Sequence, residues 1–463
     1  MDPRHPQEHQ GPTSQTPAKL QNRSTAFLDG LRGLAALFVF IQHYVGSFDA
    51  NVHEHGFGEQ GQYYYLASLP FLRIVFSGGS AAVAIFFILS GYVLGKSSLC
   101  LLRDGEQPAC VMSLISAVIR RPLRLYIPTL GVTLTYAILM HAPFGIVPDI
   151  PWAPPKASIF AELTHWLIES INFFNPFQTH GSNRAWYSYN LVVWTIPIEL
   201  KGSMLVYSLV AICAFSGSSQ LLSLALLMTS FTVLLHLGKW TMACFVAGLA
   251  LSILDVHSMD MTYLSRHCSQ RAQSSLKHFL FVAGFYLLCQ PSHDGHPEYS
   301  LDTLGWHYLT LWTPKAYNLT QYYRYWHSWG ALLLVYSILR IQWLQKFLNS
   351  RPLRYLGKVS FMLYLVHLAV LGIFGDRIGR LFGQVPFGAK DSWWDNRLYI
   401  PDIGPAGMSS RFLVCMLIML PICLAIADCG TKLLDTPSVR MGKWVVQRLG
   451  LDKRIVLAIR VNR

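Results

Sequence analysis

The stretch FLDGLRGLAALFVFIQHY, from Phe27 to Tyr44, decides how the rest of the chain is interpreted. Arg32 stands near the start of an apolar run and His43 lies inside it, with no ionisable residue between them. On a helix this eleven-residue spacing makes about three turns, so the two side chains share one face ~16 Å apart. If the run spans a membrane, Arg32 reaches the headgroups and His43 lies near the midplane, where an imidazole needs a polar partner or a water-lined cavity.

The composition favours a membrane protein over a soluble protein with a buried helix. Of the 463 residues, 52% are hydrophobic and 13% are charged, whereas soluble domains average ~25% charged residues. The formal net charge is +13, but the basic residues fall in short polar intervals between apolar runs. This distribution is typical of membrane topology and argues against nucleic-acid binding.

Apolar runs long enough to cross a bilayer recur along the chain, which predicts an all-α polytopic protein with about ten transmembrane helices. The expected spans are 28–46, 70–95, 122–141, 189–215, 219–237, 239–255, 277–290, 328–345, 358–376 and 410–433. If the N-terminus is cytoplasmic, every inner interval is net basic, whereas the outer interval from Val45 to Pro70 has no Lys or Arg. Both termini are therefore expected in the cytoplasm.

Three regions follow from this pattern. Residues 1–26 are expected to form a disordered polar tail, because Met1 to Ser24 lack the apolar segment of a cleaved signal peptide. Residues 27–437 hold the transmembrane domain, and residues 438–463 form a basic cytoplasmic tail. None of the nine cysteines forms a C-x-x-C pair, so we expect neither a disulfide framework nor a metal site.

Three arginines stand together in RRPLRLYIP, at the expected inner mouth of the third span: Arg120, Arg121 and Arg124. Their simplest role is to set the topology of the span. The alternative is anion capture, because guanidinium groups bind phosphates in a bidentate manner. In that case Arg32 joins them from the first span. In FFILSGYVLGK, Ser90 and Gly91 are small residues expected to let helices pack closely.

Two further ionisable side chains lie inside apolar runs. Glu199 follows Pro197 in WTIPIELKGS, and a buried carboxylate there needs a partner. Either it belongs to a functional site, or it forms a structural ion pair with Lys201 or Arg32. In KVSFMLYLVHLAV, His367 lies ~14 Å past Lys358 on a helix, at nearly the expected depth of His43. A histidine with a neighbouring carboxylate is typical of general-base catalysis at neutral pH.

Five motifs occur in the order LDGLRGLAAL, FFILSGYVL, RRPLRLYIP, WTIPIEL and SFMLYLVH. Together they resemble the acyltransferase-3 family of integral membrane O-acyltransferases, and the likeness extends from about Phe27 to Pro437. The W-T-I-P-x-E form followed by Gly-Ser is similar to fungal members, many of which serve secondary metabolism.

The resemblance implies transfer of an acyl group, often acetyl, from acyl-CoA to a hydroxyl of a small molecule, glycan or lipid. Acyl-CoA is then a co-substrate, and no permanently bound cofactor is expected. The resemblance assigns His43 with Arg32 to the essential pair and Arg120, Arg121 and Arg124 to coenzyme binding. Glu199 and His367 are further catalytic candidates.

Other functions stay open at this point. Intramembrane His and Glu also serve proton relays, so a transporter or proton-coupled permease is the main alternative, although no matching broken half-repeats are evident. An acyltransferase of the other large membrane class and a non-catalytic scaffold are further alternatives. The expected location is an endomembrane or the plasma membrane. The acceptor and the oligomeric state do not follow from the residues.

Overall fold

The computed structural model describes residues 25–143, 154–175, 186–217, 219–317, 321–386 and 390–451, and these residues form helices and no strand. Most of the expected N-terminal tail and residues 452–463 of the expected C-terminal tail lie outside the described residues. The longer helices are α2 (Ala26–Phe48), α5 (Gly79–Arg103), α6 (Gln107–Leu139), α7 (Ile159–Phe174), α8 (Thr195–Ser216), α9 (Gln220–His236), α10 (Trp240–Val256), α12 (Gln270–Leu288), α15 (Arg324–Arg340), α17 (Arg351–Val370), α19 (Ser410–Gly430) and α20 (Thr436–Arg448).

Short helical segments connect them. The α-helical ones are α3 (Ala50–Glu54), α4 (Arg73–Ser77), α11 (Met259–His267), α13 (Glu298–Leu301), α14 (His307–Leu311), α16 (Gln342–Leu348) and α18 (Asp376–Phe382). The 3₁₀ segments are η1 (Leu66–Ser68), η3 (Leu191–Trp194) and η4 (Lys315–Tyr317). Two π-turns, η5 (Leu371–Gly375) and η6 (Thr431–Asp435), join α17 to α18 and α19 to α20 without a break in the helix.

The described residues are helical, so the all-α expectation is confirmed. Eight of the ten expected spans each overlap mainly one helix, whereas 70–95 contains α4 and α5, and 328–345 crosses the bend between α15 and α16. By length and composition, five of the described helices can cross a membrane, and up to seven can if each of two bent pairs counts as one span. The five candidates are Ala26–Phe48, Gly79–Arg103, Leu191–Ser216, Arg351–Phe382 and Ser410–Arg448. The count of ten and the cytoplasmic placement of both termini stay predictions.

Helix α6 differs from its expected span. It begins at Gln107 instead of residue 122, because Pro108 suits a first helical turn and the half-apolar segment after it continues the helix. Arg120, Arg121 and Arg124 therefore lie in the middle of a 33-residue helix. Their place at the inner mouth of a membrane span stays a prediction. An apolar run indicates where hydrophobic residues are concentrated, but it does not indicate the residue at which a helix begins. The predicted span therefore began later than the helix.

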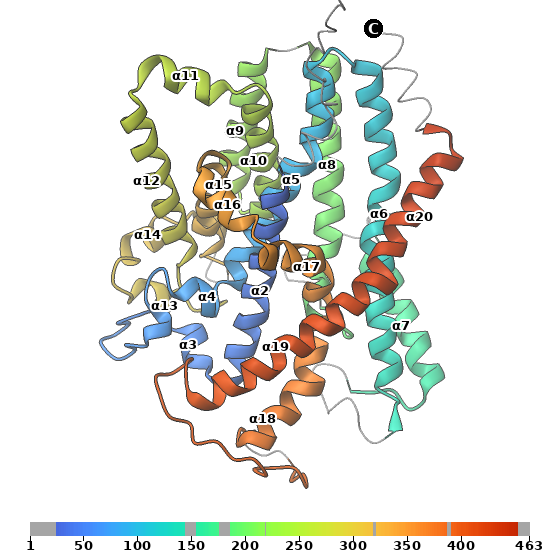
Figure 1. Cartoon of the computed structure of the whole chain (residues 1–463), viewed down its shortest axis with the longest axis vertical. Helices are drawn as coiled ribbons and strands as arrows, with labels where there is room; N and C mark the ends of the chain where they lie inside the picture. The colour runs from blue at the N-terminus through green and yellow to red at the C-terminus, as the bar shows by residue number, and fades with distance from the viewer. Residues whose placement is uncertain are drawn as a thin grey trace, which may run out of the picture.

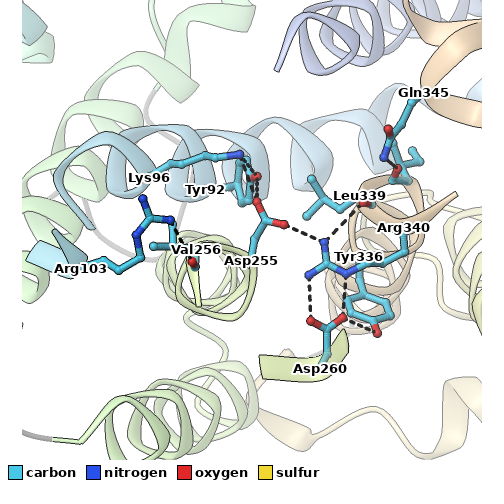
Figure 2. Close-up of polar contacts among 11 residues, drawn as sticks. Tyr92, Lys96, Arg103, Asp255, Val256, Asp260, Tyr336, Leu339, Arg340 and Gln345 are labelled. Atoms are coloured by element: carbon cyan, nitrogen blue, oxygen red, sulfur yellow. Dashed lines mark hydrogen bonds and ion pairs between the residues drawn. The ribbon is translucent and has the colours of Figure 1, made fainter. Parts of the chain in front are cut away.

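The two bent pairs meet at one network of ion pairs. Helix α10 bends by 61° into α11, and α15 bends by 97° into α16. Arg340, the last residue of α15, donates to Asp255 of α10 at 2.7 Å and to both carboxylate oxygens of Asp260 of α11 (Figure 2). Asp255 also accepts hydrogen bonds from Tyr92 and Lys96 of α5. The network thus joins four helices where their axes change direction.

Helices α2 and α17 pack side by side in the centre of the molecule (Figure 1). Glycines permit this approach, because a Cβ atom at Gly33 would lie 2.3 Å from the backbone nitrogen of Gly357. A Cβ at Gly357 would lie 2.3 Å from the carbonyl oxygen of Asp29. Such close backbone contact is typical of helix pairs that meet through small residues.

Helices α5 and α10 meet in the same way, since a Cβ at Gly91 would lie 2.2 Å from the carbonyl oxygen of Phe245. The packing role predicted for Gly91 is therefore confirmed. Two hydrophobic cores result. One is built mainly on α5, α10 and α15, and the other on α2, α17 and α19.

Candidate functional site

A cavity of about 200 Å³ lies where the two hydrophobic cores meet. Its lining comes from α2, α5, α6, α8, α17 and η6. The lining combines apolar side chains, among them Phe86, Phe87 and Phe361, with charged residues. We call this space the central cavity.

Four of the seven residues predicted for the site line the central cavity: Arg32, Arg121, Arg124 and Glu199. Lys358 and Asp435 complete its charged groups. Four cationic side chains and two carboxylates in this lining leave a surplus of positive charge. The arrangement therefore favours an anionic ligand with an apolar part.

Glu199 forms an ion pair with Arg121 inside the cavity, with both side chains less than 15% exposed. Its carboxylate also accepts a hydrogen bond from Ser90 at 2.5 Å. Arg121 donates a further hydrogen bond to Ser203 at 2.8 Å. A structural ion pair was one reading of Glu199, but its partner here is Arg121, while Arg32 pairs with Asp29 at 3.0 Å.

Ser90 therefore has a polar role in addition to the packing role that its small size predicted. Its hydroxyl and the guanidinium of Arg121 together hold Glu199 in place. The carboxylate was expected near a histidine, but its hydrogen-bond partners among the described residues are Ser90 and Arg121.

Arg120 lies next to the central cavity, in a second cavity of about 230 Å³. This second cavity is lined by α5, α6, α8 and α20, and it shares Arg121 and Arg124 with the central cavity. Arg120 donates to the carbonyl oxygen of Ser116, one turn back on α6. The three arginines predicted from RRPLRLYIP thus border two adjoining spaces.

The two predicted histidines come together from α2 and α17. The imidazole rings of His43 and His367 lie 5.1 Å apart between centroids. His367 is fully buried, and its Nδ1 lies 2.8 Å from the carbonyl oxygen of Tyr364. Because a carbonyl only accepts hydrogen bonds, Nδ1 carries the proton and the lone pair is on Nε2. That Nε2 has no hydrogen-bond partner among the described residues.

His43 is partly exposed, and no hydrogen bond joins its ring to the described part of the chain. A third histidine lies near it, His53 of the short helix α3. Burial is the main reason that the pKa of His53 is lowered to about 3, with smaller electrostatic contributions from neighbouring His43, Arg73 and His293, so this side chain is neutral at physiological pH.

Tyr364 connects the cavity with the histidine pair. It lines the central cavity, and its ring lies 6.0 Å from that of His367, whereas neither His43 nor His367 is itself among the cavity-lining residues. Its hydroxyl donates to the carbonyl oxygen of Val192 at 2.6 Å, which fixes the ring. The predicted residues therefore form two groups, a charged cavity and a histidine pair, with Tyr364 between them.

The model of a family described as "Acyltransferase domain" matches residues 25–428, which is most of the chain. The chain belongs to the acyltransferase-3 family. The matched residues include the histidine pair and most of the helices that line the two cavities: α2, α5, α6, α8 and α17. The match ends before η6 and α20, which complete the lining.

Three fungal proteins are similar over most of this acyltransferase-3 chain. The "O-acetyltransferase PaAT-1" of Phomopsis amygdali is 28% identical, over 92% of this chain and 85% of that protein. "Acyltransferase clz18" of Cochliobolus lunatus is 24% identical, over 76% and 83%. "Acyltransferase R4" of a Phoma species is 22% identical, over 76% and 84%. No solved structure matches the chain.

Several residues of this acyltransferase-3 site were missing from the sequence prediction: Lys358, Tyr364, Asp435 and Lys443. Helical periodicity could have found Tyr364, because it lies three residues before His367 and faces the same side of α17. Asp435 and Lys443 left no such signal, since they come from the far end of the chain and reach the cavities only through the packing of η6 and α20.

Proposed function

We propose that this protein is an acyl-CoA-dependent O-acyltransferase that moves an acyl group, most simply acetyl, to a hydroxyl of a small molecule. The observation that carries the proposal is a cationic cavity that adjoins, across Tyr364, two neighbouring imidazole rings, of which His367 has an Nε2 without a hydrogen-bond partner among the described residues. Family membership supports acyl transfer. The name of the Phomopsis relative supports an oxygen acceptor and an acetyl donor.

In this proposal the two cavities hold the donor. Arg121 and Arg124 border both spaces and offer guanidinium groups to the phosphates, whereas the phenylalanine side chains of the central cavity suit the uncharged arm. The acyl thioester then lies at the Tyr364 end of the cavity, nearest to His367. No residue needs to hold a permanently bound cofactor or a metal.

His43 acts as the general base, because it is the partly exposed member of the pair and no hydrogen bond to a described residue occupies its ring. It takes the proton of the acceptor hydroxyl while the oxygen attacks the thioester carbonyl. The carbon–sulfur bond then breaks, and the protonated imidazole returns the proton to the departing CoA thiolate. The neighbouring ring of His367, held by the Tyr364 carbonyl, orients His43 and shares the site.

We also propose that the protein is a multi-pass integral membrane enzyme, in an endomembrane or the plasma membrane, with the donor cavities facing the cytoplasm. The apolar candidate spans and the basic intervals between them support this orientation. The acceptor is a small molecule, glycan or lipid, and a fungal secondary metabolite is the candidate suggested by the W-T-I-P-x-E sequence motif.

Calorimetric titration of the purified protein in nanodiscs tests the proposal. We expect micromolar binding of acetyl-CoA and of free CoA by the unmodified chain, and loss of that binding in the Arg32→Ala, Arg121→Ala double variant. Folded protein that binds no acyl-CoA would refute the proposal and would revive the transporter alternative. Arg103→Ala is the matched control, because Arg103 lies outside both cavities and pairs with exposed Asp104.

A further inference from the structure

We propose that the second cavity binds the phosphorylated nucleotide end of the donor, and that Lys443 on α20 is a ligand of the ribose 3′-phosphate. This inference rests on the proposed use of acyl-CoA and adds a binding site formed by a helix beyond the family match, which ends at residue 428. It assigns a binding role to a region expected from sequence to be only a basic tail.

The charge of the second cavity differs from that of the central cavity. Its lining includes no carboxylate, but it includes Lys443 and the three arginines of α6. Hydroxyl groups from α5, α6 and α8 complete the polar surface: Ser97, Ser98, Ser113 and Tyr207. Cations with hydroxyl donors and no acidic group are the surroundings that a phosphate ester requires. The central cavity carries Glu199 and Asp435, which makes it the less suitable place for phosphates.

The two arginines that both cavities share indicate the orientation of the bound acyl-CoA. Arg121 and Arg124 line both cavities, whereas Arg120 and Lys443 line only the second cavity and Tyr364 only the central one. In acyl-CoA the pyrophosphate separates the nucleotide from the pantetheine arm. A pyrophosphate at the two shared arginines thus leaves the nucleotide in the second cavity and sends the arm through the central cavity toward Tyr364.

Helix α20 is held against α6 closely enough for Lys443 to take part. Gly442 is buried, and a Cβ at this position would lie 3.3 Å from Cγ of Arg120. The next residue, Lys443, is exposed and forms no ion pair among the described residues. Its ammonium is therefore available to an anion that enters beside Arg120.

Titration with CoA and with 3′-dephospho-CoA tests the assignment on the full-length protein in neutral-lipid nanodiscs. We expect the unmodified chain to prefer CoA by about ten-fold, as for a charge-assisted contact. Lys443→Ala is expected to weaken CoA binding by a similar factor and to leave 3′-dephospho-CoA binding unchanged, so that the preference disappears. Lys443→Arg keeps a cation there and is expected to retain the preference.

Arg440→Ala is the matched control, because Arg440 is exposed on the same helix and does not line the cavity. A Lys443→Ala protein that still prefers CoA over 3′-dephospho-CoA would overturn the inference, as would an unmodified chain without the preference. In either case the proposed function survives if CoA still binds. Loss of CoA binding only in nanodiscs with anionic lipid would show that the cavity holds a lipid headgroup, and would also overturn the inference.

Discussion

The imidazole of His43 on α2 lies 5.1 Å from that of His367 on α17, although 324 residues separate them in the chain (367 − 43). Neither ring makes a hydrogen bond to a carboxylate of the described residues; the Tyr364 carbonyl orients His367 instead. The site therefore differs from a serine-hydrolase triad, in which an acidic side chain holds the base. Among the described residues, a backbone carbonyl contacts His367 and a second imidazole lies beside it.

His43→Ala and His367→Ala are each expected to lower acyl transfer by about 10²- to 10⁴-fold, the usual contribution of a positioned general base. Binding of acetyl-CoA should persist, because neither histidine lines the central cavity. Release of CoA thiol from acetyl-CoA, with a panel of hydroxyl compounds as acceptors, measures the effect. His267→Ala, at an exposed position on α11, is the control. Full turnover in His43→Ala would remove the general-base assignment.

Arg124→Ala is expected to raise the dissociation constant of CoA by at least ten-fold, because its guanidinium borders both cavities and forms no hydrogen bond with the described residues. Arg124→Lys should recover part of the affinity, since it keeps the charge and loses the bidentate geometry. Calorimetric titration measures both. Unchanged affinity for CoA in Arg124→Ala would contradict the binding role of this arginine and would leave only its role in setting membrane topology.

Gly357→Ala is expected to destabilise the protein by about 1–3 kcal/mol, because the added methyl group overlaps the backbone of α2. Separation of α2 from α17 also moves His43 away from His367, so transfer should fall with the melting temperature. Gly375→Ala is a matched control, since a Cβ there would meet only ordinary contacts at 3.6 Å. Equal stability and turnover of the two variants would contradict the role assigned to the glycine contact.

Arg340→Ala is expected to destabilise the fold by about 3–5 kcal/mol, because it leaves two largely buried carboxylates without their common partner. Thermal unfolding followed by tryptophan fluorescence measures the change. Coenzyme binding by the protein that remains folded should stay intact, since Arg340 lines neither cavity. A small shift, similar to that of a surface substitution, would mean that the bends at α11 and α16 do not depend on this network.

Acidification is expected to loosen the contact of α7 with the segment before η3. Burial tends to raise the pKa of Glu162, but hydrogen bonds from Tyr189, the Lys156 amide and His141 outweigh it and leave the pKa below its usual value. A depressed folded-state pKa stabilises the fold above the unfolded value of ~4.3, and this contribution is lost as the pH falls through the folded value.

The melting temperature should accordingly fall more steeply below about pH 4.5 in the unmodified chain than in Glu162→Gln, which cannot ionise. Differential scanning measurements from pH 7 to pH 3 compare the two proteins. Parallel curves would show that Glu162 does not couple folding to protonation.

The sequence determined the class of the protein and most of the residues of its site. Low charge and long apolar runs favour membrane-compatible helices, and the described residues of the expected runs are mostly helical in the structure. The spacing from Arg32 to His43 and the position of His367 indicated polar side chains inside apolar helices. Such side chains are energetically costly in a membrane and are therefore candidates for a functional site. Composition and residue spacing are local properties of the sequence, so these features can be predicted without knowledge of the tertiary structure.

The partners of those residues were decided by tertiary packing alone. Glu199 meets Arg121 and Ser90, which lie 78 and 109 residues away, because α5, α6 and α8 pack around one cavity. The approach of α20 to Arg120 was equally hidden, since it depends on which helix surfaces bury each other. The period of apolar residues identifies the face of a helix that will be buried. Which other helix packs on that face is decided by tertiary contacts, here by glycines that allow close approach and by ion pairs between helices.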